Sequence, residues 1–85
     1  MKEFTYVIKD EIGIHARPAG LLVKEAAKSG CTVTLESKGK SVDARKLMAI
    51  MQMGVKKGDE LKVTVEGDNE EEAAKALEKF LEENL

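Results

Sequence analysis

The chain has 85 residues with 42% hydrophobic content and a formal net charge of −2, which limits it to one small domain and excludes a disordered chain. No apolar run approaches the roughly 20 residues that span a bilayer, and no charged-then-apolar leader precedes Phe4. The single cysteine, Cys31, excludes an internal disulfide and is expected to be a small buried residue. We therefore expect a cytoplasmic protein. The charge is uneven, because residues 1–65 hold twelve bases and eight acids whereas residues 66–85 hold two bases and eight acids, a distribution that can steer charged partners.

The first third of the chain predicts a strand followed by a helix. Residues 2–8 predict the strand, because their side chains alternate with a period of two. Residues 9–13 form a polar loop. Residues 16–29 predict a helix that ends at Gly30. Its apolar stripe is expected to contain Ala19, Leu22, Val23 and Ala26.

The middle of the chain predicts two strands and a short helix. Residues 31–36 and 40–42 are the strands, joined by a tight turn that contains Gly39. Residues 47–53 predict a short helix, and Gly54 ends it.

The last third predicts a strand and a helix. Residues 61–66 alternate as a fourth strand. The side chain of Asp68 or Asn69 is expected to cap the last helix, and the glutamates at 70–72 suit its positive end. The order β-α-β-β-α-β-α predicts an α+β domain with an antiparallel sheet, helices on one face and water on the other. The buried stripe of the last helix is expected to contain Ala73, Ala76, Leu77, Phe80 and Leu81.

A histidine, His15, stands where the first loop becomes the first helix. The opening amides of a helix lack internal partners and carry the positive end of its dipole, which makes an anion site. Pro18 is tolerated in the first turn, and the amides of Ala16 and Arg17 remain free. The Arg17 guanidinium can hold phosphate oxygens bidentately. Gly13 is expected to let the chain bend and to leave room for a partner.

These residues predict a phosphoryl-accepting site. The ordinary pKa of histidine, about 6.5, leaves much of the imidazole neutral and nucleophilic at physiological pH. A helix N-terminus and a neighbouring cation both favour that neutral form. Phosphoryl transfer needs mainly positioning and charge stabilisation. A lone histidine at a helix start is more often a cap or a surface residue, so the hypothesis rests on the coincidence of His15, Arg17 and Pro18 after a glycine loop.

The run GIHARP over residues 13–18 resembles the active-site signature of HPr, the histidine phosphocarrier of the bacterial phosphoenolpyruvate-dependent sugar phosphotransferase system. Residues 44–51, Gly54-Val55 and residues 57–59 resemble the second signature region of that family, and the length and element order match as well. The resemblance implies one domain over residues 1–85 with an open-faced β-sandwich fold, in which three helices cover one face of a four-stranded antiparallel sheet.

The resemblance also implies a function. His15 would accept a phosphoryl group on Nδ1 from phosphorylated enzyme I, assisted by Arg17, and donate it to the A domains of enzymes II for sugar uptake. Such a protein is a carrier rather than a stand-alone enzyme, and it needs no cofactor. A monomer suits a protein that visits two partners in turn. The alternative is a regulatory HPr-like paralogue that binds and controls a transcription factor or an enzyme.

A partner surface is expected beside His15. Leu21 points away from the core stripe of its helix, and a short helix over residues 47–53 cannot bury every side against a one-layer sheet. Ile50 is expected in the core. The expected interface contains Gly20, Leu21, Lys24, Leu47, Met48 and Met51, and the basic rim that would attract acidic partners contains Arg17, Lys24, Arg45, Lys46 and Lys56.

One position departs from the family pattern. Many Gram-positive relatives carry a serine that a dedicated kinase phosphorylates, and Lys46 stands at that position here. We therefore expect that this serine switch is absent or altered. Neither a nucleic-acid module nor a metal site is expected, because the chain has no helix-turn-helix signature, no aromatic platform and no basic excess, and His15 and Cys31 form no ligand cluster.

Overall fold

The computed structural model describes residues 1–85 and contains four strands and three helices. The predicted order β-α-β-β-α-β-α is confirmed, and element ends differ from the predicted ones by at most one residue. The elements are β1 (Lys2–Val7), α1 (Ala16–Ser29), β2 (Thr32–Ser37), β3 (Lys40–Asp43), α2 (Leu47–Gln52), β4 (Glu60–Glu66) and α3 (Glu70–Asn84).

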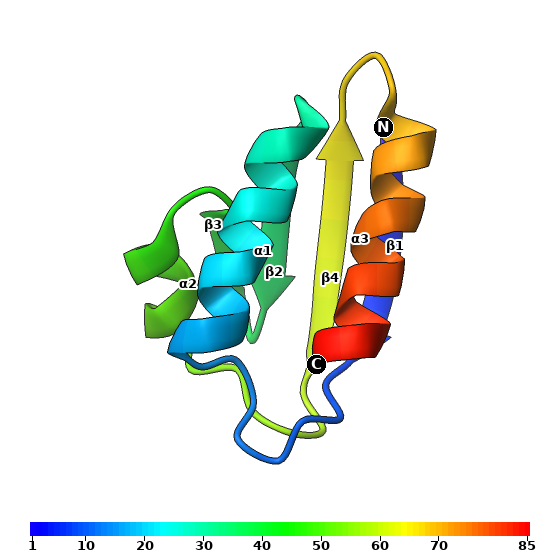
Figure 1. Ribbon diagram of the computed structural model, residues 1–85. Helices are drawn as coiled ribbons and strands as arrows, with labels where there is room; N and C mark the ends of the chain where they lie inside the picture. The colour runs from blue at the N-terminus through cyan, green and yellow to red at the C-terminus, as the bar shows by residue number, and fades with distance from the viewer.

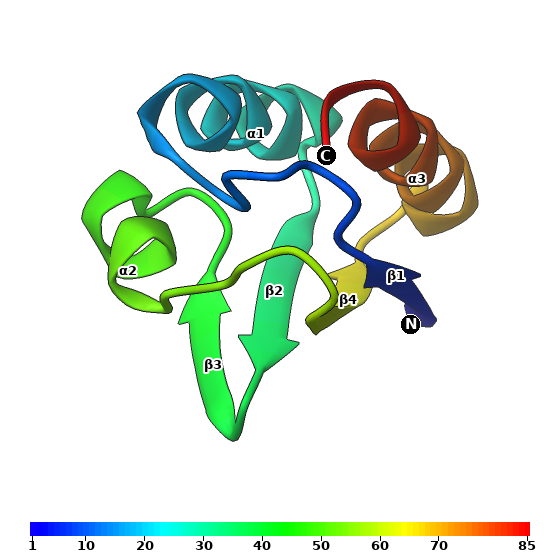
Figure 2. The same ribbon diagram turned by 90° about the horizontal axis from the view of Figure 1, so that it is seen from below.

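The strands form one antiparallel sheet in the order β1-β4-β2-β3. The late strand β4 therefore lies in the interior of the sheet and pairs with both β1 and β2 (Figure 1). All three helices lie on one side of the sheet (Figure 2). The expected open-faced sandwich is confirmed, and none of its helices is long and apolar enough to cross a bilayer.

The core lies between the sheet and the helices and contains 19 buried apolar residues. Three residues of the apolar stripe expected on α1 are buried, and the fourth, Val23, is half-buried against the core. The expected burial of Cys31 and Ile50 is confirmed. On α3 the prediction was partly wrong, because Ala76 is exposed and Phe80 is only half-buried. At about 100° per residue, Ala76 points about 100° away from the mean direction of the three buried residues of this helix. These three are Ala73, Leu77 and Leu81.

The predicted side-chain cap of α3 was also wrong. Asn69 occupies the N-cap position, but its side chain makes no bond to the helix amides. Its ψ of 39° lies outside the extended region in which a cap side chain usually turns toward those amides. Its Oδ1 atom accepts a hydrogen bond from the Cys31 Sγ–H instead, over 3.2 Å. Asn69 therefore fastens α3 to the start of the second strand.

The far face of the sheet is polar. Lys62 on β4 forms ion pairs with Glu3 on β1, over 3.3 Å, and with Glu36 on β2, over 3.9 Å. This polar surface faces water, whereas the helices cover the opposite face of the sheet (Figure 2).

Candidate functional site

His15 is the N-cap residue of α1. Its backbone is extended, with φ −121° and ψ −176°, and its main-chain oxygen accepts the first helical hydrogen bond from the Ala19 N–H over 2.9 Å. The imidazole is half-buried and has no hydrogen-bond partner in the chain. The ring is therefore available to a molecule outside the protein, as the sequence predicts for a phosphoryl acceptor.

The next two residues present free donors. The N–H groups of Ala16 and Arg17 find no acceptor in the chain, and Pro18, which has no N–H, is buried in the first turn. Arg17 is exposed, and its guanidinium takes part in no ion pair. Two unpaired amides and an unpaired guanidinium thus stand directly after the imidazole, an arrangement suited to an anion.

A loop far along the chain supports the residues before His15. The Ile14 N–H donates to the main-chain oxygen of Val55 over 3.0 Å. Gly13 is buried with a φ of +82°, and a Cβ atom there would collide with the Val55 oxygen and would stand 2.7 Å from the Cα atom of Lys56. The expectation that Gly13 leaves room for a partner was therefore wrong, because the chain's own main chain fills that space.

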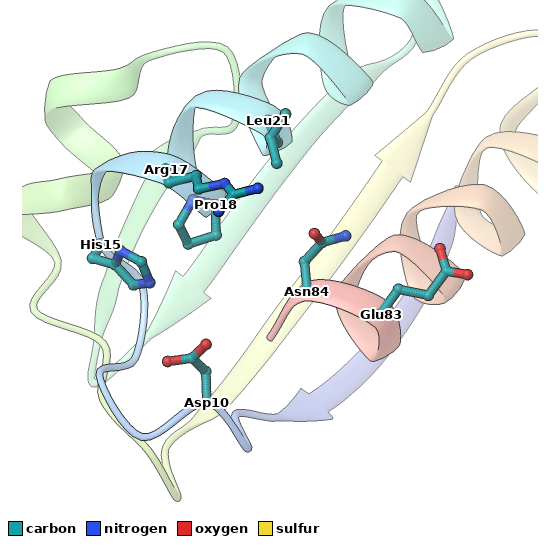
Figure 3. A pocket seen from close by; sticks show the side chains of 7 residues that line it. All are labelled: Asp10, His15, Arg17, Pro18, Leu21, Glu83 and Asn84. Atoms are coloured by element: carbon teal, nitrogen blue, oxygen red, sulfur yellow. The ribbon is translucent and has the colours of Figure 1, made fainter.

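An open hollow of about 310 Å³ lies beside the imidazole (Figure 3). Figure 3 shows the His15 ring, the Arg17 guanidinium and the Asp10 carboxylate around this space, and the end of α3 closes its other side. Local patterns did not single out Asp10, which lies in the loop just before α1, or Glu83 and Asn84, which come from the distant end of α3. The lining consists of Asp10, His15, Arg17, Pro18, Leu21, Glu83 and Asn84.

Exposed apolar side chains stand on the two helices next to the site. The helices α1 and α2 pack against each other (Figure 1). Leu21 is 37% exposed, Leu47 39%, Met48 66% and Met51 39%, in contrast to the fully buried Ile50. Lys24 is exposed and Gly20 half-buried on α1. The structure thus brings the residues of the expected interface onto two neighbouring helices.

The basic rim is less uniform than the sequence predicts. Arg45 pairs with the Asp43 carboxylate over 3.2 Å, and this bond holds the pKa of Asp43 below its usual value. The charge of Arg45 is therefore largely compensated. Lys24, Lys46 and Lys56 are exposed and take part in no ion pair. No three His, Cys, Asp or Glu side chains gather closely enough to hold a metal ion.

The sequence and the structure of the chain both match HPr proteins. A family model described as the PTS HPr component phosphorylation site matches residues 2–83. The structure of HPr-C-His from Thermoanaerobacter tengcongensis is 45% identical, with a TM-score of 0.92, and the match covers 99% of this chain and 94% of that one.

Two Bacillus proteins are also similar. The phosphocarrier protein HPr from Bacillus anthracis is 32% identical, with a TM-score of 0.87 and coverage of 94% of this chain and 95% of that one. Crh, the catabolite repression protein of Bacillus subtilis, is 34% identical, with a TM-score of 0.77 and coverage of 94% and 92%. Crh is described as a dimer with a swapped domain.

Proposed function

The chain belongs to the HPr family of the phosphotransferase system, and from this premise we propose that it carries a phosphoryl group on His15. In this proposal the group comes from phosphorylated enzyme I and passes to the A domains of sugar-specific enzymes II. The observation that carries the proposal is the free imidazole of His15 beside the unpaired amides of Ala16 and Arg17.

The transfer to His15 needs only groups that stand at the site. The Nδ1 lone pair of the neutral imidazole attacks phosphorus and forms the N–P bond, while the bond from phosphorus to the donor breaks and the donor keeps its electron pair. The ring proton stays on Nε2, so no base is required. The amides of Ala16 and Arg17 and the Arg17 guanidinium stabilise the charge on the phosphoryl oxygens.

The onward transfer reverses these steps. A nucleophile of the acceptor attacks phosphorus, the N–P bond breaks, and His15 leaves as a neutral imidazole. Because the hollow beside the ring is open, the phosphoryl group stays accessible to a second partner. This access suits a carrier that releases its cargo to another protein rather than an enzyme that completes a reaction alone.

The same partners would dock on the exposed apolar side chains of α1 and α2. Leu47 and Met48 lie at the start of α2, and Leu21 faces outward on α1. The unpaired charges of Lys24 and Lys46 favour partners with an acidic surface. We propose that Gly20, Lys24 and Met51 complete this contact, and that the protein acts as a monomer with this surface uncovered.

A regulatory role like that of Crh is the second candidate, because Crh is 34% identical and has the same fold. The free His15 and Arg17 favour the carrier, since a purely regulatory protein needs neither. Lys46 offers no hydroxyl group for a seryl kinase. Transfer from the phosphorylated protein to isolated enzyme II A domains distinguishes the two roles, and sedimentation distinguishes a monomer from a swapped dimer.

The deciding experiment is incubation with phosphoenolpyruvate and enzyme I. The protein should gain one acid-labile phosphoryl group by mass spectrometry, and His15→Ala, shown to be folded by circular dichroism, should gain none. An unchanged mass for the wild-type protein, or a stable phosphoryl group on the variant, would refute the proposal.

A further inference from the structure

The main chain on either side holds His15 in place. Downstream, its carbonyl oxygen accepts the Ala19 N–H over 2.9 Å, and helix α1 fixes that side. Upstream, the Ile14 N–H donates to the Val55 oxygen over 3.0 Å. The imidazole itself makes no hydrogen bond in the chain. On the N-terminal side, the position of His15 therefore depends on the loop that carries Val55.

Asp59 closes this loop. Its Oδ2 atom accepts the Lys56 N–H over 2.8 Å, and its own N–H donates to the Lys56 oxygen over 3.0 Å. A hydrogen bond from an amide to a carboxylate is about twice as strong as one between neutral groups. The bond to the Lys56 amide lowers the pKa of Asp59, and the Lys38 ammonium group lowers it further. Lys56 is also the residue whose Cα atom lies against Gly13.

Lys38 reaches the same loop from the turn between β2 and β3. Its ammonium group contacts the Asp59 Oδ2 atom over 2.9 Å and the Gly54 oxygen over 3.2 Å. In the sequence, Gly54 and Asp59 stand on either side of Val55 and Lys56, the two residues whose main-chain atoms lie against Gly13. Lys38 has a φ of +54°, a conformation that is costly for a residue with a side chain. The turn thus places one cation where it ties together both ends of the supporting loop.

We propose that Asp59, with Lys38 as its counterion, is a positioning residue for phosphoryl transfer at His15. The contacts run from Lys38 to Asp59, from Asp59 to the Lys56 amide, and from the Val55–Lys56 main chain to Gly13 and Ile14. Removal of the carboxylate loosens the loop and lets the imidazole drift relative to the amides of α1. This inference rests on the proposed function of His15.

The test uses a small phosphoryl donor, phosphoramidate, which reaches the imidazole without protein docking. We expect Asp59→Ala to take up the phosphoryl group about three- to tenfold more slowly, because misplaced reacting groups react more slowly. Lys38→Met should slow uptake about twofold, as the ion pair is half-exposed. Lys62→Met, which removes an ion-pair partner on the far face of the sheet, is the matched control and should react at the wild-type rate.

A second measurement separates positioning from a general loss of stability. Rates are compared at a temperature where every variant is folded, and hydrogen exchange is followed at the Ile14 N–H and at the amides of β4. Positioning predicts faster exchange at Ile14 in Asp59→Ala with unchanged protection in β4. Should Asp59→Ala fail to fold, Asp59→Asn retains an oxygen that can accept the Lys56 N–H, and it should show an intermediate rate.

Wild-type uptake in both Asp59→Asn and Lys38→Met, or unchanged exchange at Ile14, would overturn the inference. A wild-type protein that takes no phosphoryl group from phosphoramidate or from enzyme I would instead refute the proposed function. In that case exchange at Ile14 still tests whether Asp59 holds the loop, so the two failures are distinguishable.

Discussion

Gly13 and Lys56 lie main chain against main chain, and a Cβ atom on Gly13 would stand 2.7 Å from the Cα atom of Lys56. Gly13→Ala therefore adds a collision to the cost of a positive φ. We expect the free energy of unfolding to fall by about 3 kcal/mol, measured in urea. Gly30→Ala is the control, since Gly30 has a φ of +71° but open space around it, and it should cost only about 1 kcal/mol. Equal losses in the two variants would refute the contact.

Arg17 makes no ion pair in the fold, so its removal should affect transfer without affecting stability. We expect Arg17→Ala to unfold within about 0.5 kcal/mol of the wild-type protein. Phosphoryl transfer from enzyme I should slow about tenfold or more, because a donor to the transferring group is lost. Arg17→Lys should recover only part of the rate, since an ammonium group cannot bind two oxygens side by side.

Met48 is 66% exposed beside the site, which makes it a candidate anchor for partners. Met48→Gln should raise the KM of enzyme I for this protein about tenfold and leave the free energy of unfolding unchanged. The rate with phosphoramidate should not change, because that donor does not dock. Val7→Gln is the matched control, since Val7 is 46% exposed at the end of β1 and outside the proposed interface. A tenfold rise in KM for both variants would argue against a local docking surface.

Tyr6 has a buried hydroxyl group without a hydrogen-bond partner. Tyr6→Phe should therefore stabilise the protein by about 1 kcal/mol at pH 7, measured in urea. Burial raises the pKa of Tyr6, and the negative charge of Glu82 raises it further. Because the unfolded tyrosine ionises first, from about pH 10, the wild-type protein should lose stability relative to the variant as the pH rises above that value. A destabilised variant would mean that the hydroxyl has a partner.

Asp43 holds the segment before α2, and Arg45 lowers the pKa of its carboxyl through side-chain and main-chain hydrogen bonds. A lowered pKa in the folded state means stability that is present above the unfolded value of about 3.9 and lost as the pH falls through the folded one. Asp43→Asn should thus be less stable than the wild-type protein near pH 7, and the difference should shrink in acid. Thermal unfolding at several pH values measures this, and a constant difference would contradict it.

Local patterns predicted the elements well because each strand and helix has its own periodicity. They could not predict the position of β4 inside the sheet, since pairing depends on segments that meet only in the folded chain. The errors at Ala76 and Asn69 have the same origin. The exposed angle of Ala76 depends on how α3 lies on the sheet, and Asn69 bonds to Cys31, which is 38 residues away.

Local sequence patterns likewise indicated some residues of the site and missed others. The residues His15, Ala16 and Arg17 are contiguous, so the sequence alone indicated the proposed phosphoryl acceptor and its donors. The support from Val55 comes from a loop far along the chain and the lining by Glu83 from the end of α3, and no local signal marks them. Asp10 lies in the loop before α1, but no motif indicates that it faces the site. Gly13 illustrates the limit, since its flexibility was evident but the atoms that require it lie more than 40 residues away.

The inner position of β4 has a consequence for protein synthesis. Strands β1 and β2 share no hydrogen bonds and are joined only through β4, which ends at Glu66. A nascent chain that stops before this strand cannot close the sheet, because β1 pairs with no other strand. Ribosome-bound chains should therefore lack the complete sheet until most of the polypeptide has left the exit tunnel.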